Sequence, residues 1–214
     1  MMKVLVGCEY TGIGREIFIR AGHDAISCDL DPTEIRRPKS HHQGDIMKHL
    51  ESVSDGWYDL IILHPDCTAM ALCGNGTYAP KGVMSDARKE AIEWTARLWE
   101  LAKKKGKRVC LENPGSVIFP VLRRLGAKVQ YVQPWWFGHP ETKMTGLALH
   151  ELDELEKTDD VHDHMMTLPK KERHKTWYAS PSERRGKDRS RSFPGMLAAM
   201  ADQWAINEVN NENL

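Results

Sequence analysis

The feature that most constrains the fold is the alternation of short apolar runs with longer helical patterns between residues 3 and 132. Apolar runs of strand length lie at residues 3–6, 24–28, 59–63, 107–111 and 128–132. Helical patterns lie at residues 15–20 and 85–105, and in the second one apolar side chains recur every three or four positions. Strands that alternate with helices predict a doubly wound α/β domain with a mostly parallel sheet.

The pattern changes after residue 149. Residues 150–192 are polar and lack a clear period, whereas a helical pattern rich in Ala and Met resumes at residues 193–209. The sequence therefore predicts one α/β domain made of residues 1–149 and 193–214, with a small irregular insertion at residues 150–192. We expect the final helix to pack back on the sheet.

Charge is sorted along this insertion. The formal net charge of the chain is zero, but residues 151–163 hold seven acids and one lysine. Residues 170–191 hold nine Lys or Arg against three acids. Such a basic segment can attract phosphates, and we expect contacts to nucleic acid from Arg184, Arg185 and Lys187. A merely solvated segment is the alternative explanation of the same charges.

Composition is that of a globular protein. Hydrophobic residues make up 41% and charged residues 28%, which excludes a wholly disordered, collagenous or membrane-embedded chain. No run approaches the roughly 18 apolar residues of a membrane span, and the N-terminus lacks the features of a signal peptide. The five cysteines are scattered and odd in number, which favours free thiols in a reducing compartment. We expect a cytoplasmic protein with no membrane partner.

Glycines and carboxylates follow the first two predicted strands. In an open parallel sheet, ligands bind at the carboxyl ends of the strands. Residues 7–14 (GCEYTGIG) form a loop whose glycines permit a tight turn and close approach of a ligand. The spacing differs from G-x-G-x-x-G, which disfavours a dinucleotide. Asp29 and Asp45 follow at the same edge, where carboxylates bind ribose hydroxyls, so the sequence predicts a nucleoside-like cofactor.

A cysteine and a carboxylate follow the next two strands. Cys67 comes after the strand at residues 59–63, and Glu112 comes after the strand at residues 107–111. One helix joins these strands, so we expect them to be neighbours. A cysteine thiolate is a strong nucleophile, and a glutamate opposite it can supply a proton to a substrate ring. Burial of Cys67 as a small apolar side chain is the alternative interpretation.

Taken in order, the motifs GCEYTGIG, CDLDP, GDI, DLIILHPDC, LENP and FGHPETKMTGLAL resemble those of the DNA cytosine-5 methyltransferases. The resemblance covers about residues 3–149 and 193–205, and the compact chain is similar to methyltransferase-like proteins carried by bacteriophages. It implies the Rossmann-like fold of S-adenosylmethionine-dependent methyltransferases. It also implies S-adenosylmethionine as the cofactor and DNA as the partner, with the target cytosine flipped out of the duplex.

The resemblance further implies roles for individual residues. Cys67 matches the nucleophile that attacks cytosine C6, Glu112 matches the acid that protonates N3, and Asn113 is expected to orient Glu112 or contact the ring. Lys143 is the one basic residue left in the later motif and is expected to contact nucleic acid. The residues expected to bind the cofactor are Tyr10, Thr11, Gly12, Gly14, Asp29, Asp45 and Pro65.

The chain also departs from the family pattern. Pro65-Asp66-Cys67 replaces Pro-Pro-Cys, Asn113-Pro114 replaces Asn-Val, and Glu141, Lys143 and Thr145 occupy the Gln-x-Arg-x-Arg positions. The region for target recognition shrinks to about residues 150–192. Two alternatives therefore stay open, namely methylation of a free pyrimidine nucleotide by the same fold and a catalytically idle DNA-binding protein. Methylation of an amino group is disfavoured because the loop lacks an aromatic residue.

Two further clusters favour ordinary structural roles. Residues 159–164 (DDVHDH) are dense in possible metal ligands, but no matching set of Cys or His lies elsewhere. We therefore predict a solvated acidic loop and no metal. Trp135, Trp136 and Phe137 follow a predicted strand, where packing in the core is favoured over a platform for base stacking.

Overall fold

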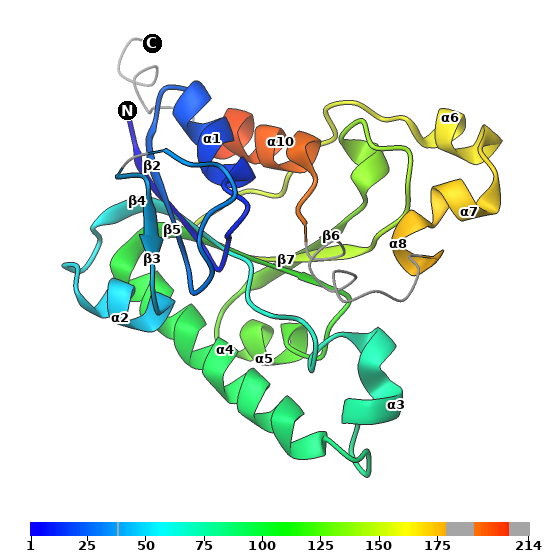
Figure 1. Cartoon of the computed structure of the whole chain (residues 1–214), viewed down its shortest axis with the longest axis horizontal. Coiled ribbons are helices and arrows are strands. Elements are labelled where there is room, and N and C mark those ends of the chain that lie inside the picture. The colour runs from blue at the N-terminus through cyan, green and yellow to red at the C-terminus, as the bar shows by residue number, and fades with distance from the viewer. Residues whose placement is uncertain (38, 179–190, 206–214) are drawn as a thin grey trace.

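The computed structural model describes residues 1–37, 39–178 and 191–205, and these residues form a layered α/β structure (Figure 1). Their seven-stranded sheet has the order β3-β2-β1-β4-β5-β7-β6. The strands are β1 (Lys3–Gly7), β2 (Asp24–Asp29), β3 (His41–Gln43), β4 (Tyr58–Leu63), β5 (Gly106–Pro114), β6 (Lys128–Val132) and β7 (Thr145–His150). The helices around the sheet are α1 (Ile13–Arg20), α2 (Ile46–Glu51), α4 (Ser85–Lys105), α5 (Phe119–Arg124) and α10 (Pro194–Trp204). Shorter helical turns are η1 (Leu72–Gly74), α3 (Asn75–Tyr78) and η2 (Pro134–Trp136).

The sheet is mostly parallel. The pairs from β3 to β5 are all parallel, whereas β7 is antiparallel to both of its neighbours, β5 and β6. The five predicted strands and the two predicted helices of the first part of the chain lie at the expected places, within a few residues at their ends. The predicted doubly wound, mostly parallel α/β sheet is confirmed.

Helices cover both faces of the sheet. α1 and α10 pack together on one face, and α2, α4 and α5 lie on the other (Figure 1). The alternation of side chains along β4 explains the two cores. Leu60 and Ile62 belong to the core beneath α1 and α10, whereas Ile61 and Leu63 belong to the core beneath α4. A strand that is buried on both faces has a continuous apolar sequence, as β4 does.

Two short elements, β3 and α2, were not predicted from the sequence. β3 and α2 span three and six residues, which is too short for a period to be evident. The expectation that Glu112 and Asn113 follow the fourth strand was wrong, because they belong to the last residues of β5. Asn113 pairs with Gly146 of the antiparallel strand β7, so the ladder of hydrogen bonds continues to the end of β5.

The chain leaves the sheet after β7. Between β7 and α10, the described residues form α6 (His162–Thr167), α7 (Lys170–Arg173) and α8 (Lys175–Tyr178), which lie together at one end of the molecule (Figure 1). α10 then returns to pack against α1. The division into a catalytic domain and an insertion stays a prediction. None of the described helices is long and apolar enough to cross a membrane.

Candidate active site

The catalytic candidates meet at the carboxyl edge of the sheet because β4 and β5 are adjacent and parallel. Leu63 of β4 pairs with Leu111 of β5, so that the next residues, His64 and Glu112, leave this pair at the same edge. Cys67 lies on the loop that follows β4. The structure thus brings the predicted cysteine and glutamate together from neighbouring strands, and their chemical roles stay a prediction.

Glu112 is held by a buried histidine. The side chains of His64 and Glu112 are 7% and 9% exposed. The Nδ1 atom of His64 lies 3.0 Å from Oε2 of Glu112 and 3.3 Å from Oγ of Ser192. Burial raises the pKa of Glu112, but the hydrogen bond and charge of His64, with the charge of Lys143, outweigh burial and lower that pKa overall. Glu112 is therefore a carboxylate at neutral pH.

Asn113 joins the ends of β4 and β5. It is buried, and its side-chain amide donates a hydrogen bond of 3.1 Å to the carbonyl of Pro65. Within the described part of the chain, the Oδ1 atom of Asn113 is buried and has no hydrogen-bond partner. A buried amide oxygen without a donor is costly, and a ligand that supplies the donor would relieve that cost. Pro65, which was predicted to bind the cofactor, uses its carbonyl for the bond to Asn113.

The loop after β4 fixes Cys67 next to acidic groups. Oδ1 of Asp66 accepts hydrogen bonds from the backbone N–H of Thr68 at 3.0 Å and from its hydroxyl at 2.6 Å. Burial raises the pKa of Cys67 to about 11, and the charges of Glu112 and Asp66 act in the same direction, against Lys143. Cys67 is therefore a thiol at neutral pH, so that attack on a substrate requires removal of its proton.

Lys143 lies close to both catalytic candidates. Its positive charge lowers the pKa of the Glu112 carboxyl and opposes the rise in the pKa of the Cys67 thiol. The Nζ atom lies 3.5 Å from the carbonyl of Arg191 and 5.4 Å from the centre of the Phe193 ring. The predicted contact of Lys143 with nucleic acid would thus be made at the catalytic edge.

The residues just before α10 also reach this edge. Ser192 contacts His64, and the guanidinium of Arg191 binds both carboxylate oxygens of Glu34 at 2.9 and 2.7 Å. Sequence reasoning did not identify His64 or Ser192 as site residues. The available signal was that His64 directly follows the buried strand β4, in the position where ligand-binding residues gather.

The loop after β1 depends on Gly12. This residue has φ of 80°, in the left-handed region, and stands at the N-terminus of α1. A Cβ atom at this position would lie 2.6 Å from Nη2 of Arg15. Thr11 is buried, and its hydroxyl donates to the carboxylate of Glu9 while accepting from the N–H of Ile13 at 3.2 Å. The side chain of Thr11 is therefore already engaged within the loop.

Gly14 and Tyr10 connect this loop to its surroundings. A Cβ atom on Gly14 would lie 3.2 Å from Cγ1 of Val6, so glycine allows α1 to approach β1 closely. The carbonyl of Tyr10 accepts a hydrogen bond of 3.0 Å from the N–H of Glu34, which follows β2. The two loops expected to hold the cofactor are thus tied together.

Asp29 and Asp45 lie at the same edge. The N–H of Gly44 donates to the carbonyl of Asp29 at 2.8 Å, which links the two positions. Asp29 ends β2, and burial raises the pKa of its carboxyl. Asp45 caps α2 through Oδ1, which accepts from the N–H groups of Met47 and Lys48 at 2.7 and 3.3 Å. Asp45 therefore has a structural role in addition to its predicted one.

Cys8 marks the point where the cofactor residues and the catalytic loop converge. Burial raises the pKa of its thiol, and the charges of Asp29, Asp45 and Asp66 add to the effect. Cys8 also has φ of 57°, which is unusual for a residue other than glycine and is often found at functional sites. The three carboxylates therefore share one region of the sheet edge with Cys8.

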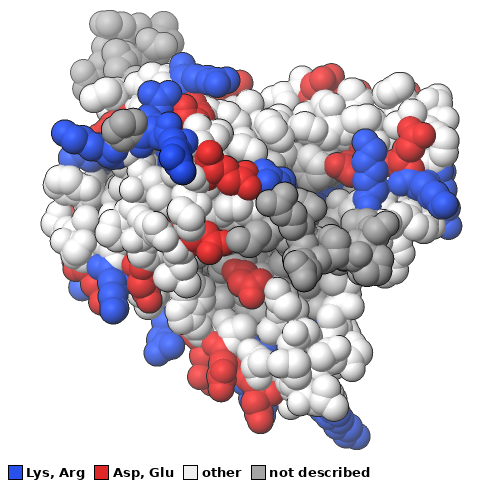
Figure 2. All heavy atoms as spheres, in the orientation of Figure 1, with Lys and Arg blue, Asp and Glu red and all other residues white. Residues whose placement is uncertain are grey.

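The basic residues predicted to contact nucleic acid, Arg184, Arg185 and Lys187, lie outside the described residues. On the face shown in Figure 2, the described Lys and Arg side chains gather in separate groups, near α1 and near α7. The predicted DNA interface stays a prediction.

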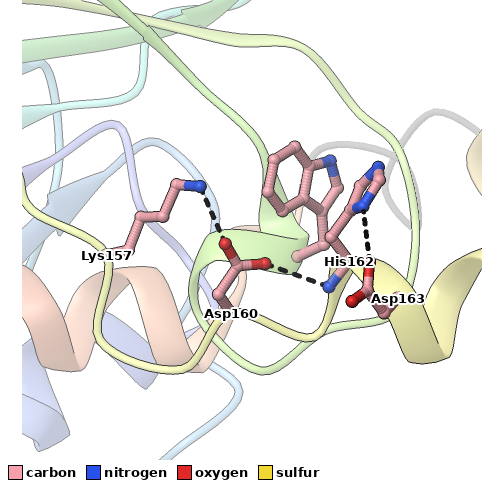
Figure 3. A pocket seen from close by; sticks show the side chains of 5 residues that line it. Lys157, Asp160, His162 and Asp163 are labelled. Carbon is pink, nitrogen blue, oxygen red and sulfur yellow. Dashed lines mark hydrogen bonds and ion pairs between the residues drawn. The ribbon is translucent and has the colours of Figure 1, made fainter.

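A separate hollow lies beside η2 (Figure 3). It is lined by Trp135, Lys157, Asp160, His162 and Asp163. The rings of Trp135 and His162 lie 4.8 Å apart, and Nζ of Lys157 lies 2.7 Å from Oδ2 of Asp160. The polar groups of this hollow bind one another. Among the residues that the structure describes, no group of three or more His, Cys, Asp or Glu is arranged to hold a metal ion.

The order of the strands defines the fold. A sheet of order 3-2-1-4-5-7-6, with β7 antiparallel between β5 and β6, is the sheet of S-adenosylmethionine-dependent methyltransferases. The chain has this fold, and the predicted fold type is confirmed.

Comparison with known proteins adds distant structural likenesses. No protein-family profile and no curated protein matches the chain. A candidate DNA modification methyltransferase encoded within an E. coli prophage is similar with a TM-score of 0.48 and 16% identity, over 79% of this chain and 56% of that one. The S. pombe Dnmt2 methyltransferase is similar with a TM-score of 0.45 and 19% identity, over 79% of this chain and 57% of that one. The Entamoeba histolytica methyltransferase EhMeth is similar with a TM-score of 0.43 and 13% identity, over 75% of this chain and 57% of that one. The chain spans a little more than half the length of these structures.

Proposed function

We propose that this chain methylates C5 of cytosine in DNA, with S-adenosylmethionine as the methyl donor and a covalent adduct at Cys67. The observation that carries the proposal is the meeting of Cys67, Glu112 and Lys143 at one edge of a methyltransferase sheet. A thiol, a buried carboxylate and a cation are the groups needed to add a nucleophile to C6 of a pyrimidine and to balance the charge that develops on the ring.

The residues after β1 and β2 fit this cofactor. When bound, S-adenosylmethionine supplies an activated methyl group on a sulfonium. Asp29 would accept hydrogen bonds from the ribose hydroxyls, and Asp45 would accept from the adenine amino group. Oε2 of Glu9 is buried and has no hydrogen-bond partner within the described part of the chain, so it is suited to an ammonium group. Gly12 leaves the turn before α1 free of a side chain.

The chemistry at cytosine follows from the catalytic edge. Sγ of Cys67 bonds to C6, the proton that the thiol loses passes to the carboxylate of Glu112, and Glu112 delivers it to N3, so that electron density accumulates at C5. Asn113, whose Oδ1 lacks a partner among the described residues, would accept a hydrogen bond from the exocyclic amino group of the ring. After C5 has gained the methyl group, loss of the C5 proton and of the sulfur restores the aromatic ring and frees Cys67.

An exposed apolar pair favours DNA as the substrate. Leu72 and Met144 are 48% and 47% exposed, and both approach Gly115 just after β5. A cytosine in a duplex must leave the stack to reach Cys67, at a cost of a few kcal/mol. Apolar side chains that insert between bases are a common way to hold a duplex in such a distorted state. We expect Leu72 and Met144 to take that role.

Methylation of a free cytosine nucleotide is the second candidate. It is favoured by the shortness of the segment between β7 and α10, because a free nucleotide needs no recognition of a target sequence. The same catalytic residues would serve both substrates.

Bisulfite sequencing of DNA from cells that express the protein tests the proposal. Protected cytosines should occur with the wild type and with Cys73→Ser, which changes an exposed cysteine nearby. They should be absent with Cys67→Ser. Unprotected DNA together with a methylated cytosine nucleotide pool would favour the second candidate. Unprotected DNA with an unmodified pool would contradict both.

A further inference from the structure

We infer that Arg88 is a positioning residue for the proposed reaction, because its buried guanidinium fixes the loop that carries Cys67 (the Cys67 loop, residues 64–74) to α4. This inference rests on the proposed function, since the exact place of Cys67 matters only if its thiol attacks the pyrimidine. Arg88 lies in the first turn of α4 and is 6% exposed. Arginine is almost never buried to this degree unless its donors are paired, so its partners show what it holds.

The guanidinium of Arg88 binds three acceptors in and next to the Cys67 loop. Its Nε atom donates to the carbonyl of Ala69 at 2.7 Å, and its Nη2 atom donates to the carbonyl of Ala71 at 3.3 Å. Its Nη1 atom donates at 2.8 Å to Oδ1 of Asn75, the first residue of α3, which packs against α4 (Figure 1). Because the donors of a guanidinium form a rigid planar fork, these bonds fix the orientation of the loop as well as its distance from α4.

The carbonyls that Arg88 binds belong to a turn that begins at Cys67. The carbonyl of Cys67 accepts hydrogen bonds from the N–H groups of Met70 at 3.0 Å and of Ala71 at 2.8 Å. Backbone hydrogen bonds therefore connect Cys67 directly to the residues that Arg88 holds. A displacement of this turn would displace the thiol.

The segment that follows β5 holds the same turn through a second set of bonds. The carbonyl of Met70 accepts from Oγ of Ser116 and from the N–H of Val117, both at 3.1 Å. This segment comes directly after β5, whose last residues include Glu112. The turn is thus fixed between α4 and the strand that carries Glu112, so Arg88 helps to set where Cys67 stands relative to that carboxylate.

Replacement of Arg88 by lysine separates positioning of the loop from support of the fold. Arg88→Lys keeps the positive charge, but a single ammonium cannot reproduce the fork that reaches three acceptors. The matched control is Arg108→Lys. Arg108 is a half-buried arginine of β5 that donates to the carbonyl of Trp204 at 2.7 Å, and it lies near the end of β5 opposite Glu112.

The first measurement compares the single-turnover rate of adduct formation on a 5-fluorocytosine duplex with the affinity for that duplex. Arg88→Lys should lower the rate by roughly 10- to 100-fold, because a displacement of about 1 Å near a reacting group can cost about 100-fold. Its affinity for the duplex should stay that of the wild type, since Arg88 is buried. Arg108→Lys should match the wild type in both. An unchanged rate in Arg88→Lys, or an equal loss in Arg108→Lys, would overturn the positioning role.

The second measurement is the rate at which iodoacetamide alkylates each cysteine of the protein alone, mapped by mass spectrometry. Cys67 is half-buried, whereas Cys110 is fully buried on β5. Arg88→Lys should speed alkylation of Cys67 by roughly tenfold or more, because a loosened loop exposes the thiol to water. Cys110 should stay unreactive, since the sheet remains folded. An unchanged rate at Cys67, or faster alkylation of both cysteines, would overturn the positioning role.

The two measurements distinguish failure of this inference from failure of the proposed function. If the wild type forms no adduct, the proposed function fails, and alkylation of Cys67 still decides whether Arg88 fixes the loop. If the wild type forms the adduct while Arg88→Lys leaves both the adduct rate and the alkylation of Cys67 unchanged, the proposed function stands and the positioning role fails.

Discussion

Nδ1 of His64 lies 3.0 Å from Oε2 of Glu112, although 48 residues separate them in the sequence. The pairing of Leu63 with Leu111 brings them together, because it sets the register of β4 against β5. The contact keeps a buried glutamate ionised, so the free protein holds no proton on the group that is proposed to protonate the substrate.

This relationship predicts how stability changes with acid. The folded-state pKa of Glu112 is lowered, so the group contributes stability that is fully present above its ordinary pKa and is lost as the pH falls through the folded value. The free energy of unfolding of Glu112→Gln should therefore lie furthest below that of the wild type near neutral pH, and this difference should shrink below about pH 4. Urea denaturation over this range measures it, and a gap that widens with acid would contradict the assignment.

Asp29 should contribute to binding of the cofactor. Asp29→Ala should weaken binding of S-adenosylmethionine by roughly 1–3 kcal/mol, as expected for the loss of hydrogen bonds to a charged acceptor. Asp24→Ala, at the other end of β2, should bind like the wild type. Titration calorimetry measures both, and equal affinities for the two variants would remove Asp29 from the site.

Arg15 should stabilise the loops that are expected to hold the cofactor. Its guanidinium is fully buried and donates to Oγ of Ser27 at 3.0 Å and to the carbonyl of Ser40 at 3.4 Å. Arg15→Met should cost about 3–5 kcal/mol of unfolding free energy, because buried acceptors lose a charged donor. Arg20→Met, at the exposed end of α1, should change stability by about 0.5 kcal/mol or less. Chemical denaturation compares the two, and similar losses would refute this role.

The segment at residues 170–191 should give DNA binding its dependence on salt. Each phosphate contact lowers the logarithm of the binding constant by about 0.9 per logarithmic unit of salt concentration. Replacement of Arg184, Arg185 and Lys187 by glutamine should flatten this slope for duplex DNA in a fluorescence titration. An unchanged slope would show that the basic residues do not contact phosphates.

The sheet could be predicted because its signals are local. β4 is a continuous apolar run, and α4 carries a helical period over its whole length, so both were evident in the sequence. β7 was not predicted, since its apolar residues were interpreted only as part of a motif. Its pairing with β5 extends that strand to Pro114 and thereby fixes where Glu112 lies.

The candidate site was predicted only in part. Cys67 follows β4 and Glu112 lies near the end of β5, and the adjacency of these two strands could be inferred from the single helix between them. The contacts of His64 with Glu112 and Ser192 could not be predicted, because both residues lie far from His64 in the sequence and a single histidine forms no sequence pattern. The role of Asp45 as the N-terminal cap of α2 could not be predicted either, since α2 is too short to show a helical period.

Mass spectrometry of the protein after incubation with a 5-fluorocytosine duplex and S-adenosylmethionine tests the central claim most directly. Fluorine at C5 blocks the final loss of a proton, so the adduct persists. We expect an adduct that maps to Cys67, is absent in Cys67→Ser, is retained in Cys73→Ser and is suppressed in Glu112→Gln. An adduct that maps to Cys73, or none with the wild type on DNA that it binds, would contradict the account.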